Sequence, residues 1–344
     1  MLRPAWIIVL LLMSVRIASA QSPEISMREF ASGQIKKGVR SIGFGGNGAT
    51  WGNYGLVYLE HDTVVVDGGS TVYTNGNVFG FTAAGITTPQ LWHGLAIYVL
   101  GLAQMASNIK LSLHDENLGP AMLPVRGDGV DGLVALRLAM PLGSGFSIGI
   151  QLSYEVSRFD ATLDNNSATI HYRTEWLPSG GVGVAWRPNP RVLVGARVIL
   201  NHDWERRFDG VGGRQGLNRS YEYRAGLSFS PWKGALIDLG GTVLDRANGI
   251  TNTESVVGGA NLGFEQAFYG RLFALRAGVD ECQLGFGSAC SATAGLSVRR
   301  GPVNVDVAYV YNLGQARIGS LFGQESHTGL MTLTLDFGAL IRRR

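Results

Sequence analysis

Few residues of this sequence are placed for covalent chemistry. His61, His114 and His202 each precede an aspartate, and His327 follows Ser326. A hydrolytic site needs a serine, a histidine and an acid, or a pair of acids, held close together. Adjacent residues of a strand face opposite sides, and the sequence contains no HExxH or GxSxG motif. We therefore predict that the protein is not an enzyme, with hydrolysis by way of His202 or His327 as an alternative.

A glycine-rich segment matches a cofactor motif by letter. Residues 43–48 read Gly-Phe-Gly-Gly-Asn-Gly, which is the spacing of the dinucleotide-binding fingerprint. That fingerprint works between a strand and a helix whose N-terminus holds a pyrophosphate. The surrounding sequence predicts neither element, so we predict no cofactor, and we predict no metal site. We expect these glycines to allow close packing against a wall of the protein instead.

The first twenty residues have the pattern of a secretory signal peptide. Arg3 is followed by an apolar run at 7–15 and by Ala-Ser-Ala at 18–20, the small residues that signal peptidase reads. The apolar run is too short to cross roughly 30 Å of hydrocarbon as a helix. We expect export and cleavage after Ala20, and we exclude residues 1–20 from the fold.

Beyond residue 53 the sequence alternates between apolar and polar residues. The clearest run places Phe146, Ile148, Ile150, Leu152, Tyr154 and Val156 on one face and Ser147, Gly149, Gln151, Ser153, Glu155 and Ser157 on the other. Alternating runs of roughly ten residues are typical of transmembrane β-strands. A content of 49 glycines and 16% charged residues also favours many strands and tight turns. The sequence therefore predicts an all-β fold.

The breaks between the runs indicate a barrel. Short breaks such as 87–90 and 299–302 contrast with long polar breaks such as 104–130 and 201–220. Short periplasmic turns and long outer loops are characteristic of outer-membrane barrels, whereas a soluble β-sandwich, the alternative, has no reason to alternate them. We predict a transmembrane antiparallel β-barrel over residues 53–337, with about fourteen strands and with twelve or sixteen possible.

The sixth and the last strand of this barrel are special cases. Residues 165–177 fit either an extended arm of the sixth hairpin or a loop. The final run, Met331 to Phe337, alternates apolar and polar residues after a glycine and resembles the C-terminal signal that barrel-assembly machinery recognises. We expect that machinery and outer-membrane lipid as partners, and we expect residues 338–344 to form a periplasmic tail.

Charged residues fall on the polar faces of the predicted strands. A charge that faces lipid costs a few kcal/mol near the bilayer midplane, so we place these residues in the lumen. The predicted lumen-lining residues are Arg137, Glu155, Arg197, Glu222, Arg224, Asp238, Arg276, Asp306 and Asp336. Their mixed signs favour salt-bridged networks, with an ion-selectivity filter as the alternative.

One predicted strand, Leu91 to Ala103, is apolar on both faces. A strand of this kind must cover something apolar inside the barrel. We predict that Leu95, Ile97 and Val99 face inward, where they contact a plug or line a path for an apolar ligand.

Cysteines and net charge bear on the compartment and the partners. The chain has two cysteines, Cys282 and Cys290, which we expect to pair as a loop disulfide in an oxidising compartment. The formal net charge of +3 falls by two when Arg3 and Arg16 leave with the signal peptide. No basic patch is evident in the sequence, so we predict no nucleic-acid partner.

The glycine-rich segment also resembles a known family. Residues 39–50, with the sequence VRSIGFGGNGAT, are similar to the N-terminal segment of FadL-type outer-membrane proteins. The resemblance implies a fourteen-stranded barrel, a plug at residues 21–52, and passive uptake of hydrophobic small molecules past that plug. The alternatives are a structural or surface-exposed barrel without transport and the hydrolase considered above.

Overall fold

A computed structural model describes residues 63–73, 78–92, 95–114, 122–163, 169–176, 179–208, 213–248, 253–282, 290–312 and 326–336. The predicted signal peptide (1–20), plug (21–52) and tail (338–344) lie outside these residues. Within the described residues, no helix is long and apolar enough to cross a membrane.

The described chain is almost entirely β-strand. In chain order the strands are β1 (Thr63–Tyr73), β2 (Val78–Trp92), β3 (Leu95–His114), β4 (Met122–Gly143), β5 (Phe146–Leu163), β6 (Thr169–Trp176), β7 (Ser179–Asn189), β8 (Val192–Phe208), β9 (Gly213–Phe229), β10 (Ala235–Asn248), β11 (Thr253–Phe268), β12 (Phe273–Cys282), β13 (Ser291–Arg300), β14 (Val303–Asn312) and β15 (Ser326–Asp336). A short 3-10 turn, η2 (Tyr269–Arg271), connects β11 to β12.

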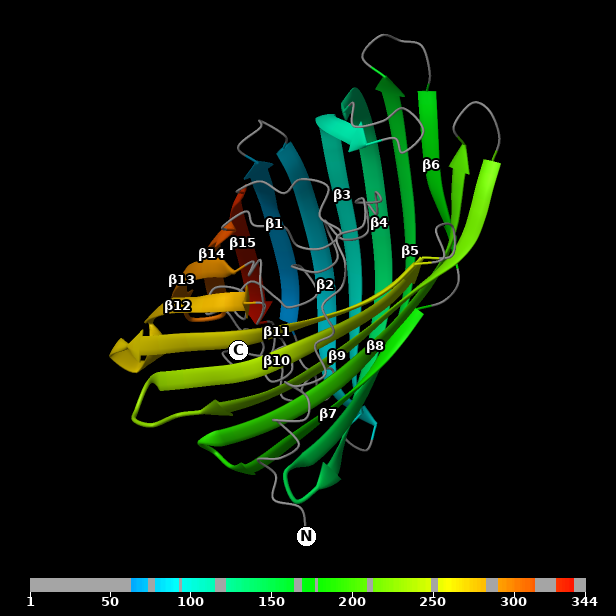
Figure 1. The fold of residues 1–344 in the computed structure, drawn as a ribbon. Helices are drawn as coiled ribbons and strands as arrows, with labels where there is room; N and C mark the ends of the chain where they lie inside the picture. Colours follow the sequence, from blue (N-terminus) through cyan, green and yellow to red (C-terminus); the bar gives the residue numbers. More distant parts are fainter. Residues whose placement is uncertain are drawn as a thin grey trace.

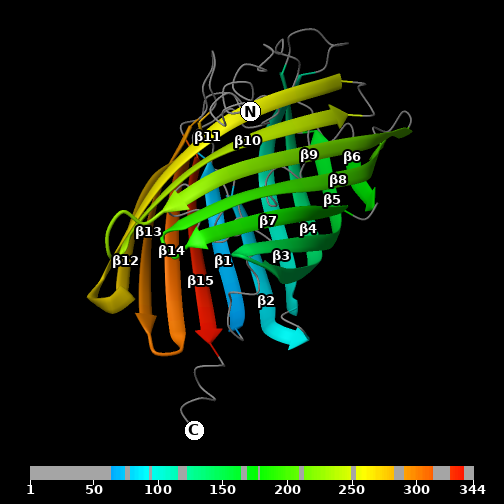
Figure 2. The same ribbon diagram turned by 90° about the horizontal axis from the view of Figure 1, so that it is seen from below.

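The strands form one closed antiparallel sheet (Figure 1, Figure 2). Closure is made by β1 and β15, which pair from Thr63 opposite Asp336 to Tyr73 opposite Ser326. Strands β6 and β7 both lie between β5 and β8 and so share one place in the ring. The fifteen strands therefore fill fourteen positions, which confirms the predicted all-β barrel. Because β6 extends the β7 strand outward, the described part of the segment considered at 165–177, residues 169–176, is an arm of the hairpin.

Burial alternates along the strands and identifies the two faces of the wall. On β5, Gln151 is 1% exposed, whereas its neighbours Leu152 and Tyr154 are 56% and 57% exposed. In a soluble protein apolar residues are buried and polar residues face the solvent, whereas here polar residues are buried and large apolar residues face outward. Hydrocarbon around the barrel makes this arrangement favourable. The buried alternate residues thus define the inner face, and the exposed ones define the outer, lipid-facing side.

Tight turns and aromatic side chains mark one end of the barrel. Between β4 and β5, Gly145 has φ +78°, and a Cβ there would lie 2.3 Å from the Arg187 carbonyl oxygen, so the turn requires glycine. The Arg187 amide donates to the Gly145 carbonyl at 2.8 Å. Next to this turn the rings of Phe146 and Trp186 stack at 5.4 Å. Strand β1 begins and β15 ends at the same end, which is the end expected in the periplasm.

The wall differs in height around the barrel. Strands β3, β4 and β5 have 20, 22 and 18 residues, whereas β12, β13 and β14 have 10 each. About 9–11 residues are enough to cross a bilayer. We call β3–β9 the long wall and β12–β15 with β1 the short wall. In Figure 1 the outer ends of β3 to β6 rise beyond the rest of the sheet.

Three breaks predicted from the sequence are wrong. Residues 104–130 were expected to form a loop, but β3 runs to residue 114 and β4 starts at 122. The break expected at 201–220 is likewise filled by β8 and β9, and β2 continues through 87–90 to Trp92. Polar residues, glycine or proline are frequent in these segments, which is why the sequence favoured breaks there.

Candidate functional site

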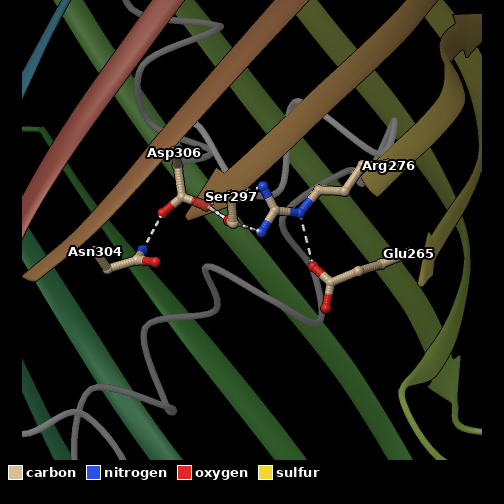
Figure 3. A network of polar contacts seen from close by, with 5 residues as sticks. All are labelled: Glu265, Arg276, Ser297, Asn304 and Asp306. Atoms are coloured by element: carbon tan, nitrogen blue, oxygen red, sulfur yellow. Dashed lines mark hydrogen bonds and ion pairs between the residues drawn. The ribbon is translucent and has the colours of Figure 1, made fainter. Parts of the chain in front are cut away.

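The inner face from β11 to β14 carries a polar network (Figure 3). Arg276 of β12 donates from Nε to Glu265 Oε2 of β11 at 2.7 Å, and its Nη1 lies 2.9 Å from Asp306 Oδ1 of β14. Ser297 of β13 accepts a hydrogen bond from Arg276 and donates one to Asp306, which also accepts one from Asn304. The register causes this contact, because Glu265 is opposite Arg276 and Ser297 is opposite Asp306. Four neighbouring strands are thus tied together by side chains.

A second charged cluster lies on the inner face of β8 and β9. Arg197 and Arg224 are directly opposite each other in the register. Glu222 forms ion pairs with both arginines, and its Oε1 lies 3.9 Å from Arg197 Nη2. One strand further, Ser228 donates a hydrogen bond to Asp238. The carboxylate of Glu222 therefore offsets the repulsion between two like charges at paired positions.

The remaining predicted lumen residues are more scattered. Arg137 of β4 donates to Gln151 Oε1 of β5 at 2.6 Å. Asp336 is buried at the periplasmic end of β15, where its Oδ2 lies 4.0 Å from Arg299 Nη2. The side chain of Glu155 lies outside the described part of the chain.

These contacts indicate whether the charged residues of the lumen are structural, ion-selective or metal-binding. Arg197 is 2% exposed, and opposite charges meet across neighbouring strands in each cluster. Buried charges of this kind are tolerated when paired and fix the geometry of the wall. A row of one sign, as in an ion filter, does not occur among the described inner-face pairs. Over the described ranges, no group of three His, Cys, Asp or Glu residues could hold a metal ion.

The inward orientation predicted for part of β3 is wrong. Val99 is 42% exposed and lies between Ile86 and Leu136 in the register, both of which are exposed on the outer face. Ile97 shares that face as an alternate neighbour, while the side chain of Leu95 lies outside the described part. Both faces of this strand are apolar, so the sequence pattern could not distinguish inside from outside.

The strand register brings together apolar residues that the sequence interpretation did not connect. The odd-numbered residues of β5 lie on the inner face, because Ser147, Gln151 and Ser153 are buried. Continuing this alternation along the outer ends of β3 to β6 places ten residues at inner positions. They are Ile109, Leu111, Leu113, Leu123, Val125, Phe159, Ala161, Leu163, Ile170 and Tyr172, which we call the apolar inner set.

The register makes the apolar inner set contiguous. Leu111 is opposite Val125, and Val125 is opposite Leu163 on the next strand. Phe159 is opposite Tyr172, two residues closer to the membrane than the neighbouring pair of Ala161 and Ile170. A continuous apolar face beyond the bilayer has no lipid to cover it, and faces of this kind mark binding sites. The signal in the sequence was the alternation within 109–113 and 159–163.

Comparison with solved structures places this architecture among known channels. The CymD monoaromatic hydrocarbon channel aligns over 86% of this chain and 96% of its own, with 12% identity and a TM-score of 0.56. A FadL homologue of Pseudomonas aeruginosa aligns over 92% and 100%, with 11% identity and a TM-score of 0.54. The toluene transporter TodX of Pseudomonas putida aligns over 83% of this chain and 92% of its own, with 9% identity and a TM-score of 0.51.

The chain has a FadL-like barrel fold. Neither protein-family models nor curated protein sequences give a match. At these identities the likeness concerns the fold, and the structural neighbours include a hydrocarbon channel and a toluene transporter.

One position of this FadL-like barrel has an interrupted ladder. Pairing with β8 stops at Trp176, opposite Asp203, and resumes at Gly180, opposite Leu200. The β6/β7 strand therefore holds one residue more than β8 in this interval, which is the pattern of a β-bulge. We call this place the seam.

The histidines considered for catalysis lie in strands, not in the loops predicted for them. His202 belongs to β8 and is opposite Arg219, and His327 belongs to β15. The His327 ring stacks on Tyr311 at 5.1 Å, and its Nδ1 lies 2.6 Å from the Tyr309 hydroxyl. This aromatic group sits at the outer end of the short wall. Cys290, just before β13, is disulfide-bonded, and Cys282 at the end of β12 is the other cysteine of the chain.

Proposed function

We propose that this protein is an outer-membrane channel for the passive uptake of hydrophobic small molecules. The observation that carries the proposal is the contiguous apolar inner set at the outer end of a FadL-like barrel. An apolar solute that leaves water for such a face gains roughly 25 cal/mol for each Å² buried. The hydrocarbon channels that share the fold support this class of solute.

The burial of the lumen supports a plugged path over an open pore. A ring of fourteen strands encloses more space than its own inward side chains can fill. Yet inner-face residues such as Arg197, Asp238 and Asp306 are almost completely buried. We propose that the segment at residues 21–52 occupies the lumen, as its resemblance to FadL-type proteins implies, and that solute passes it without a wide aqueous channel.

The seam offers a route out of the barrel. An apolar solute that reaches the seam meets a ladder whose register is already shifted between β5 and β8. Opening such a place breaks fewer backbone hydrogen bonds than parting a regular pair of strands. We place the exit of the solute there, with outer-membrane lipid as its first acceptor. Export by the signal peptide and insertion by barrel-assembly machinery complete this proposal.

The test alters the apolar inner set and leaves the barrel intact. The triple variant L111N/F159N/L163N should reduce uptake of labelled toluene or fatty acid into proteoliposomes by at least about tenfold, since each change removes apolar contact area. A matched control, V130N/F208N, alters apolar residues at outer-face positions of the same extensions and should leave uptake unchanged. Equal uptake by the triple variant and the wild type would overturn the proposal.

The alternatives predict different results in the same system. If the barrel has no transport function, the wild-type protein itself would show no uptake. If it is a polar pore, it would show steady conductance in planar bilayers. A hydrolase would cleave an ester substrate and would lose that activity in H202A or H327A. The proposal expects uptake without either conductance or hydrolysis.

A further inference from the structure

The outer face of the same extensions carries basic residues at paired positions. Arg158 of β5 is directly opposite Arg173 of β6, and Arg173 is directly opposite Arg206 of β8. Lys110 of β3 and Arg126 of β4 form another such pair. These residues alternate with the apolar inner set, so they occupy positions on the outer face. With Arg219 of β9 they form what we call the basic outer set.

The arrangement lacks an equal number of opposite charges. Between the outer edge of the apolar band and the strand ends, the acidic residues at outer-face positions of β3 to β9 are Asp128, Asp160 and Glu175, and Glu254 of β11 pairs with Arg219, so four acidic residues accompany six basic ones. Like charges at directly opposite positions of a sheet are destabilising. A row of three arginines at paired positions of neighbouring strands therefore favours the binding of anions beside it.

The basic outer set begins where the lipid-facing band ends. Arg219 lies over the Tyr221 ring at 5.7 Å, and its Nη2 is 3.0 Å from Glu254 Oε1, a pair exposed at the surface. Tyr221 is opposite Leu200, which is exposed on the outer face. On β8, Arg206 follows Leu200 by six residues, which is roughly 20 Å along the strand. On β5, Arg158 follows the exposed Tyr154 by four residues, roughly 13 Å along a strand that is tilted from the bilayer normal, so the basic outer set extends outward from the edge of the apolar band.

We propose that the basic outer set binds the phosphate groups of lipopolysaccharide in the outer leaflet. Guanidinium groups bind phosphate through two parallel hydrogen bonds, and arginine is suited to this contact at a lipid surface. The set is continuous with the apolar outer face, so one lipid molecule can place its acyl chains on the band and its phosphates on the arginine row. This inference concerns the outer face and does not depend on transport.

The experiment compares phosphorylated and dephosphorylated lipopolysaccharide. The full-length mature protein in non-ionic detergent is titrated with lipopolysaccharide before and after chemical removal of its phosphates, and binding is followed by thermophoresis. The wild type should bind the phosphorylated form at least about tenfold more tightly, since each basic group near an anionic surface contributes measurably. The variant R158Q/R173Q/R206Q should lose this preference.

A charge-matched control separates the arginine row from total charge. R191Q/K233Q/R300Q removes three exposed basic residues at the periplasmic turns and should keep the wild-type preference. The proposal is overturned if the R158Q/R173Q/R206Q variant keeps the preference or if the wild type shows none. It is also overturned if millimolar inorganic phosphate abolishes the difference, because the site would then bind free anion and not lipid.

Discussion

The long wall and the short wall are built from the same alternation but use it differently. On the short wall, strands of about bilayer height carry buried charges inside, and Arg276 joins three of its neighbours into one network. On the long wall, β3 to β6 continue past the bilayer, where the register places apolar residues at inner positions and basic residues at outer positions. The comparison teaches that charged networks lie inside both walls, since Arg197, Glu222 and Arg224 form one on β8 and β9, whereas only the long wall has the extra strand length to which we assign binding.

The largest effect is expected from breaking the network of the short wall. Arg276→Ala leaves the carboxylates of Glu265 and Asp306 buried without their cation, which should lower the free energy of unfolding by about 3–5 kcal/mol. Urea unfolding in detergent, followed by tryptophan fluorescence, measures this. Arg219→Ala on the long wall removes an exposed ion pair and should cost less than about 1 kcal/mol.

A compensated variant sharpens this result. E265Q/R276M/D306N removes the charges together, so it should recover much of the stability lost in Arg276→Ala. If the compensated variant were as unstable as Arg276→Ala, packing and not charge would explain the network.

The next effect compares two turns, one on each side of the molecule. Gly145→Ala on the long wall combines a positive φ with a contact to the Arg187 carbonyl, and we expect a loss of about 2–4 kcal/mol. Gly270→Ala beside the short wall meets a positive φ alone and should cost about 1 kcal/mol. Equal losses for both variants, by the same unfolding assay, would show that a small shift of the backbone relieves the contact with the Arg187 carbonyl.

A smaller effect is expected from the disulfide of the short wall. C282S/C290S should destabilise the barrel by about 2–3 kcal/mol, because the short β12–β13 loop gains freedom in the unfolded chain. Dithiothreitol should lower the heating temperature at which the wild type shifts its electrophoretic mobility and should not affect the double variant. A reductant effect in both would indicate that the disulfide is not its cause.

The smallest effect concerns the aromatic group at the outer end of the short wall. Tyr309→Phe removes the exposed hydrogen bond to His327 and keeps the stacked rings, so we expect a change of about 0.5–1 kcal/mol. Tyr309→Ala removes the ring as well and serves as the comparison. A loss of several kcal/mol in Tyr309→Phe would mean that this end of the short wall is more than a solvated rim.

The sequence predicted the parts of the fold where the two faces differ in polarity. Residues 146–157 and 303–307 alternate between apolar and polar or small types, and strands were found there. Alternation of polarity did not give the correct side for Val99, because its strand is apolar on both faces and its sequence does not distinguish the lumen side from the lipid side. Alternation also failed at 104–130, since strands outside the bilayer have no hydrocarbon to impose the contrast.

The candidate site was less accessible to sequence reasoning than the fold. The charged residues of the lumen could be named one by one, but the network around Arg276 depends on the register of four strands. The apolar inner set has the same origin, because Leu111, Val125 and Leu163 are neighbours through pairing and not through spacing. Register is a property of the closed sheet, and local pattern does not contain it.

The ladder between β1 and β15 has a consequence for biosynthesis. Eleven consecutive residues of the first strand are matched to the last one, so the ring cannot be sealed until the ribosome has released the end of β15. A chain truncated before Ser326 would present two raw edges, on β1 and β14, each able to recruit strands from other molecules. Pairing of β15 with β1 is therefore the step that distinguishes a complete barrel from an incomplete one.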